Sequence, residues 1–311
     1  TTFAKEWFNK ALNNGLAMFQ GNLRNIYIDE GDFDNARRVA LTAAELGNPT
    51  MMLYTGLDCH EHGKFEDAFT WFTKGAALGQ AESTAELADY YYHFYDTKEL
   101  RRLIPYNPVK AIGLYRRAAT KHFSDAGYAA LQAAFGYIFH IGHLPLDWGL
   151  IADLTHMAAT KERFMFSLPY IGYMRIHGLG VTKNIRFGVQ SLTRVLDEEK
   201  RALEEEDRVL FYDITRALTR VALGYAYEKG YVTGKPDLDA AVAYYEESHQ
   251  YILSHKANLD EELKDIPIDN EAEERLAAFK EIDGHWHYKE GFTESISTVR
   301  PGHTEWPQNA A

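Results

Sequence analysis

One pattern of small and large apolar residues recurs six times along this chain, and it constrains the fold more than any other feature of the sequence. In the clearest copies, a small residue is followed three positions later by a large or aliphatic residue and seven positions later by two small residues. The copies begin at Ala36, Ala68, Ala111, Ile151, Gly188 and Ala241. Their irregular spacing of roughly 30 to 55 residues is typical of helical-hairpin repeats. We therefore expect an array of paired helices.

A second pattern, Gly-x-x-aromatic-x-x-Gly, precedes these copies and predicts the other helix of each pair. It reads GYIFHIG from Gly136, GYAYEKG from Gly224 and, with arginine in the aromatic place, GYMRIHG from Gly172; degenerate copies start at Gly56 and Ala88. A small first residue lets two helices approach closely, and a final glycine ends a helix in a conformation that other residues resist. Each repeat is therefore predicted to be a helix, a turn and a second helix.

The turns between the helices support the same architecture. Asn107-Pro108 and Lys235-Pro236 place proline where a second helix begins, a position whose amide hydrogen would be unpaired in any case. No stretch between turn signals shows the alternation of a β-strand. The predicted fold is all-α, an α-α superhelical solenoid of about six helix-turn-helix repeats over residues 1–250. Residues 251–311 are predicted to hold a C-terminal capping helix, over Asn270–Ile282, and an irregular aromatic tail.

Two segments, IGYMRIHGLGVTKNIRFGVQSLTRVL from Ile171 and LGYAYEKGYVTGKPDLDAAVAYYEES from Leu223, show the combined pattern best. This pattern resembles the Sel-one-like repeat family, whose members are relatives of tetratricopeptide repeats, and the resemblance runs from about Ala11 to Ser248. It implies an adaptor or binder of other proteins, in bacteria often in secretion, envelope regulation or host contact. The chain departs from the pattern at Arg175, at Asn184 and in the insertion DTKELRRLIPYN.

The charge balance narrows the choice of partner. The formal net charge is −12 at pH 7, which disfavours nucleic acid or an anionic membrane and favours a protein partner with a basic or neutral surface. No apolar run approaches the length of a spanning helix, so we expect a soluble protein. No basic and apolar leader precedes Thr1, and both a cleaved signal peptide and a removed initiator Met remain open.

Catalytic and metal-binding motifs have structural alternatives in this chain. His285, His287 and His303 in the tail could share a metal ion, but no companion cysteine or acidic helix motif accompanies them. The charged stretch Asp197–Arg208 alternates in sign at a spacing of four, as on a solvated helix face. Cys59 is the single cysteine and lies within a repeat, away from any catalytic motif. We therefore expect no enzyme, no cofactor and no metal site.

The first helices of the repeats carry the candidate binding residues. Counting from the leading small residue of each repeat, the positions one and four residues later share a helix face. They form a tyrosine and histidine ladder that contains Tyr92, Tyr137, His140, Tyr173 and Tyr225. Tyrosine is frequent at binding hot spots, so the ladder is predicted to contact a partner. The alternative is that these residues pack between neighbouring repeats. Trp286 and Trp306 complete the candidate set, in a tail that either folds back on the solenoid or meets the partner.

The predicted function is a non-catalytic module that binds a protein in its concave groove, for example a bacterial immunity protein that neutralises a secreted toxin or effector. One alternative is an adaptor or regulator of an envelope signalling or secretion complex. Another is a metal protein or enzyme that uses the tail histidines. The bacterial periplasm is favoured over the cytoplasm, and the oligomeric state is left open.

Overall fold

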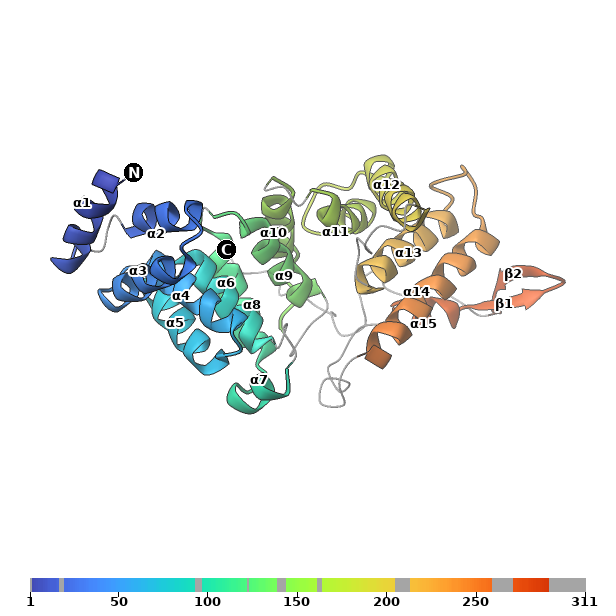
Figure 1. The fold of residues 1–311 in the computed structure, drawn as a ribbon. Helices are drawn as coiled ribbons and strands as arrows, with labels where there is room; N and C mark the ends of the chain where they lie inside the picture. The colour runs from blue at the N-terminus through green and yellow to red at the C-terminus, as the bar shows by residue number, and fades with distance from the viewer. Residues whose placement is uncertain are drawn as a thin grey trace, which may run out of the picture. The chain divides into compact units, whose positions relative to one another are not determined.

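The computed structural model describes residues 2–16, 20–92, 97–121, 123–138, 144–160, 164–204, 213–258 and 271–290. In chain order, the elements of these residues are α1 (Thr2–Asn13), α2 (Gln20–Asp29), α3 (Phe33–Glu45), α4 (Pro49–Glu61), α5 (Phe65–Ala77), α6 (Ala81–Tyr91), α7 (Lys98–Leu103), α8 (Pro108–Ala119), α9 (Ala126–Ile138), α10 (Trp148–Thr160), α11 (Phe164–His177), α12 (Ile185–Glu204), α13 (Asp213–Glu228), α14 (Leu238–Asn258), α15 (Glu271–Leu276), β1 (Phe279–Ile282) and β2 (His285–Tyr288). Figure 1 traces them along the chain.

The chain forms two compact units, Thr1–Ala130 and Leu131–Ala311, which we call unit 1 and unit 2. The boundary falls within α9. The predicted division at residue 250 follows the end of the repeat pattern instead, and it stays a prediction.

Within each unit, consecutive helices pack as pairs, as the repeat pattern predicted. The packed pairs are α2 with α3, α4 with α5 and α6 with α8 in unit 1, and α11 with α12 and α13 with α14 in unit 2. All six copies of the apolar pattern lie in a helix, namely α3, α5, α8, α10, α12 and α14. The prediction of helical pairs is therefore confirmed.

Short polar side chains start most of these second helices. Each accepts a hydrogen bond from the backbone N–H three residues later, which would otherwise lack a partner in the helix. The capping residues are Asp32, Asn107, Asp147, Asn184 and Asp237. Pro108 is the first residue of α8, as predicted, whereas Pro236 lies just before the capping Asp237.

The two glycines of GYAYEKG have the separate tasks that the sequence predicted. A Cβ on Gly224 would lie 2.7 Å from the Tyr245 ring, so the missing side chain lets α13 approach α14. Gly230 follows α13 with φ +71°, and a Cβ there would lie 2.6 Å from the backbone of Lys235. Both positions exclude larger residues for steric reasons.

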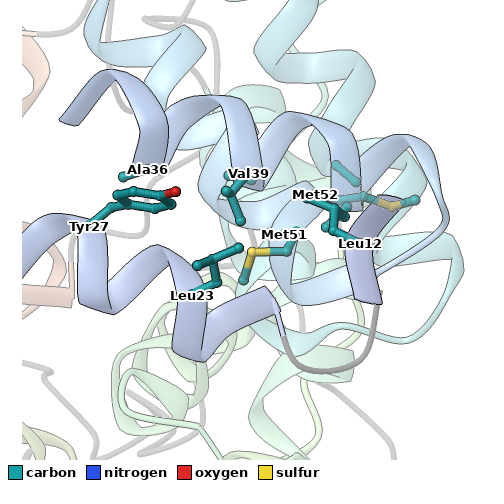
Figure 2. Packing of buried hydrophobic residues seen from close by; sticks show 10 residues of the cluster. Leu12, Leu23, Tyr27, Ala36, Val39, Met51 and Met52 are labelled. Carbon is teal, nitrogen blue, oxygen red and sulfur yellow. The ribbon is translucent and has the colours of Figure 1, made fainter. Parts of the chain in front are cut away.

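Side chains from four helices of unit 1 meet in one apolar cluster. Leu12 of α1, Leu23 of α2, Val39 of α3 and Met51 of α4 point toward one another (Figure 2) and are at most 3% exposed. Within the insertion DTKELRRLIPYN, Lys98–Leu103 form the short helix α7, and its Leu100 is completely buried in a second apolar cluster.

The prediction of a capping helix over Asn270–Ile282 is wrong in its extent. The helix α15 ends at Leu276, and β1 then pairs with β2 in an antiparallel hairpin with Phe279 opposite Tyr288. Asp283 and Gly284 form the turn with φ of 52° and 80°. Asp-Gly is a strong signal for a two-residue hairpin turn, and its conformation overrides the helical tendency of the flanking residues.

None of the helices in the described ranges combines the length and the apolar character that a membrane crossing requires.

Candidate functional site

The structure buries most of the predicted tyrosine ladder. Tyr137 on α9 is 7% exposed, Tyr173 on α11 is 0% exposed and Tyr225 on α13 is 6% exposed. Tyr92 follows α6 and is half-buried, with its ring 6.0 Å from that of Tyr106. Burial of this kind is what the alternative of packing between repeats requires. Partner binding by these residues stays a prediction. It requires that the side chains packed against the buried tyrosines move and expose them.

The remaining candidates lie at the C-terminal end or outside the described residues. Trp286 is on β2 and half-buried. His140 and Trp306 lie outside the described residues.

Tyr173 and Tyr225 belong to a continuous row of contacting rings in unit 2, which we call the aromatic column. It consists of Trp148, Tyr173, His177, Tyr225 and Tyr231. The His177 ring lies 4.5 Å from each of the two tyrosine rings, centroid to centroid. His177 is not among the predicted residues, although its position four residues after Tyr173 places both on one face of α11.

The C-terminal segment of the same chain contacts the aromatic column at Tyr173 and Tyr225. Arg275 of α15 places its guanidinium 4.7 Å from the centre of the Tyr225 ring. The hydroxyl of Tyr173 donates a 2.8 Å hydrogen bond to Glu271, at the other end of α15. Arg275 is only 3% exposed and forms ion pairs with Glu271 at 3.0 Å and with Glu228 at 3.3 Å.

Glu228, the last residue of α13, connects this segment to the repeats. Its carboxylate accepts hydrogen bonds from the hydroxyls of Tyr245 at 2.7 Å and Tyr288 at 2.9 Å, and it pairs with Lys229 at 3.0 Å. Burial alone would raise the pKa of Glu228, but Arg275, the Tyr245 hydroxyl and Lys229 together hold that pKa below its ordinary value. Glu228 is therefore ionised when the segment is in place.

The hairpin completes the return of the chain onto unit 2. Phe279 stacks on Tyr245 of α14, and Asp239 accepts hydrogen bonds from the His285 ring and the Trp286 amide, each at 2.8 Å. The bond to Asp239 raises the pKa of His285. Residues 271–290 thus follow the fold-back alternative for the tail. Within the described ranges, no three metal-ligating side chains gather, and His303 lies outside those ranges.

The charged stretch from Asp197 is less solvated than its pattern predicted. Glu199 is 4% exposed and forms ion pairs with Arg216 at 2.8 Å and Arg220 at 2.7 Å. The exposed pair of Glu198 and Arg201 fits the prediction. The buried Glu199 joins α12 to α13, and this part of the stretch serves packing.

Unit 1 carries an open groove of about 670 Å³ between the first two helical pairs. Its apolar lining includes Ile28, Phe33, Leu41, Tyr54, Leu57 and Trp71, from α2, α3, α4 and α5. Phe33 is 59% exposed and Leu41 is 42% exposed. An apolar lining that stays open to solvent is typical of surfaces that bind other molecules.

Charged side chains of both signs surround the apolar lining of the groove. They are Arg24, Arg37, Arg38, Asp58, Glu61, Lys64 and Asp67. Arg37 pairs with Asp58 at 2.7 Å, and the Arg24 guanidinium lies over the Tyr54 ring at 3.8 Å. Cys59 also lines the groove, and burial followed by the nearby Asp67 raises the pKa of its thiol, which makes it a poor nucleophile at neutral pH.

Comparison with known proteins identifies the repeats. The family model of the Sel1 repeat matches residues 2–16, 40–80, 81–122, 170–190 and 215–248. No curated protein sequence matches the chain.

Solved structures that match this chain include two bacterial proteins. One is a protective antigen present in uropathogenic Escherichia coli strains displaying an SLR fold, with 18% identity, 86% of this chain covered and a TM-score of 0.50. This chain spans about half of that antigen, 54% of its length. The other is a Sel1 repeat protein from Oxalobacter formigenes, with 20% identity, 73% of this chain and 84% of that one covered, and a TM-score of 0.48.

Sel1 repeats form a non-catalytic scaffold that generally mediates protein–protein interaction. The matches to the repeat model overlap the pairs α4 and α5, α6 and α8, α11 and α12, and α13 and α14, which include both segments that start at Ile171 and Leu223, and they do not cover α9 and α10. The resemblance stated from the sequence is confirmed, and the chain belongs to the Sel1 repeat family, with the all-α solenoid fold of that family.

Proposed function

We propose that this chain is a non-catalytic binding module and that a protein partner docks in the groove of unit 1. The observation that carries this proposal is the open apolar lining between the first two helical pairs, with Phe33 and Leu41 exposed at its edge. In a folded domain, side chains of this kind are usually covered when a partner binds.

The chemistry of the groove favours a partner segment with apolar anchoring side chains and little net charge. Its lining holds basic and acidic side chains in similar numbers, so neither a strongly basic nor a strongly acidic segment would fit there. The formal net charge of −12 over the whole chain favours a neutral or basic surface on the rest of the partner.

The groove can be tested with two leucines that differ in position but not in type. Leu41 lines the groove, whereas Leu78 follows α5, is 57% exposed and does not line it. We expect Leu41→Glu to weaken capture of a stoichiometric partner from the native cell by about tenfold or more, because the carboxylate would lose its water on binding. Leu78→Glu should leave capture unchanged. The measurement is quantitative mass spectrometry of the captured proteins.

Cross-linking from a photoreactive residue at position 41 then identifies the contacting segment of that partner. Equal recovery with both variants, or the absence of any stoichiometric partner, would overturn the proposed groove.

A finer role within this class is neutralisation of a secreted bacterial toxin or effector by tight binding, as an immunity protein. Its support is the acidic charge of the chain, which suits a basic target, and the irregular repeats, which suit one dedicated partner. Loss of toxin protection on deletion of the gene would support this role. Retained protection, or a partner that belongs to an envelope signalling or secretion complex, would favour the adaptor role instead.

A further inference from the structure

The contact between α15 and the aromatic column has the chemistry of a recognition site. Glu271 and Arg275 lie one helical turn apart in α15, and three side chains of the repeats bind them. The Tyr173 hydroxyl binds Glu271, and the Tyr225 ring and the Glu228 carboxylate bind Arg275. Arginine between a carboxylate and an aromatic face is a frequent anchor of protein interfaces.

The segment has little structure of its own without this contact. α15 has only six residues, which is too short for a stable isolated helix. Its buried apolar residues are few, namely Ala272 at 1% exposure, Ala278 at 5% and Phe279 at 4%. Much of the remaining contact consists of ion pairs and hydrogen bonds, which give specificity but little net stability because the charges lose their water.

We propose that residues 271–290 are a self-ligand of unit 2, and that a partner protein displaces them by presenting a helical turn with the motif Glu-x-x-x-Arg. The site takes the glutamate at Tyr173 and the arginine at Tyr225 and Glu228. Uncovered, it would leave the Glu228 carboxylate and the Tyr225 ring without Arg275, and these two groups favour an arginine-bearing segment over an acidic one. This second site involves unit 2 alone and does not depend on the groove of unit 1.

The first test releases residues 271–290 from their contact while they stay attached to the rest of the chain. Arg275→Glu places a negative charge against Glu228, and Lys280→Glu is the matched charge reversal, because Lys280 in β1 pairs with the exposed Glu290, at 3.7 Å, and forms no ion pair with the described part of the repeats. We expect Arg275→Glu to speed amide hydrogen exchange in α15 by about tenfold or more while α11 and α13 stay protected. Lys280→Glu should leave the exchange of α15 unchanged.

The second test asks whether the emptied site binds the segment again. A fluorescent synthetic peptide of residues 271–290 should bind the Arg275→Glu chain with micromolar affinity, measured by anisotropy. The wild-type chain should show no binding, since its own segment occupies the site. The same peptide with Arg275→Ala should bind about tenfold more weakly or worse.

A third measurement tests the motif itself. An alanine-based helical peptide that contains Glu-Ala-Ala-Ala-Arg should compete with the fluorescent peptide, whereas the reversed order, Arg-Ala-Ala-Ala-Glu, should not.

The proposal fails if α15 stays protected in Arg275→Glu, if no peptide binds, or if both orders compete equally. It also fails if Arg275→Glu unfolds unit 2, because the segment is then an obligatory part of the fold. Tyr173→Phe removes only the hydroxyl that binds Glu271 and tells a displaceable segment from an obligatory part of the fold. If the segment is displaceable, α15 exchanges faster in this variant while unit 2 stays folded.

Discussion

At the scale of single residues, the most unusual group of unit 1 is the carboxyl of Asp89. It is 5% exposed and accepts hydrogen bonds from the hydroxyls of Tyr115 and Tyr128, the second at 3.0 Å. Burial raises the pKa of Asp89 to about 7, against the opposing effect of the Tyr115 hydroxyl, and the nearby Glu86 also raises that pKa. The folded protein therefore binds a proton here that the unfolded chain releases near pH 4.

This shift predicts a pH-dependent stability. Because the folded pKa is the higher one, the stabilising effect of the protonated carboxyl is complete below about pH 4 and is lost as the pH rises to about 7. Asp89→Asn cannot ionise, so its stability should not fall in this window. At pH 8 we expect the variant to be more stable than the wild type by about 1 to 4 kcal/mol. Urea unfolding at pH 4, 6 and 8 measures this, and identical pH profiles for both chains would contradict it.

At the scale of the element, the distance between paired helices depends on small residues at their contact. In unit 1, a Cβ on Gly56 of α4 would lie 2.6 Å from the ring of Phe72, a completely buried residue of α5. Gly113 of α8 is an exposed helical glycine, and a Cβ added there would meet nothing within 4 Å. Comparing the two positions therefore separates the steric need for glycine at a helix contact from the loss of stability that glycine causes inside a helix.

The same substitution should have opposite effects at these two positions. Gly56→Ala should destabilise unit 1 by about 1 to 3 kcal/mol because it overpacks the contact with Phe72. Gly113→Ala should stabilise it by about 0.5 to 1 kcal/mol because alanine restricts the unfolded chain more than glycine does. Chemical unfolding followed by circular dichroism gives both values. A change of the same sign at both positions would rule out close helix packing at Gly56.

At the scale of the whole molecule, the excess of acidic residues acts on association more than on the fold. A net charge of −12 creates a negative potential that speeds the approach of a basic partner and is screened by salt. We expect the association rate with the captured partner to fall by about tenfold or more between low salt and about 0.5 M salt. Stopped-flow or surface-based kinetics measures the rate. A rate independent of salt would indicate a neutral partner surface.

The repeats and the ends of their helices follow from the amino-acid pattern alone. Small residues such as Ala68 and Gly224 recur at helical spacing, and close contact between two helices admits nothing larger, so these positions reveal the pairing directly. Asp237 and Gly230 mark helix boundaries for equally local reasons, since caps and left-handed turns depend on a few neighbouring residues. The Asp283-Gly284 turn is an equally local signal, but the prediction of a helix over Asn270–Ile282 did not use it.

Which side chains stay exposed, in contrast, depends on contacts that form only in the folded chain. Helical spacing places Tyr173 and Tyr225 on related faces, but it cannot show that Arg275, far along the chain, lies against them. The same applies to Glu199, whose burial depends on Arg216 and Arg220 from the next helix. Periodicity records which face of a helix is apolar within one repeat, whereas exposure depends on contacts between residues distant in sequence, which no local pattern encodes.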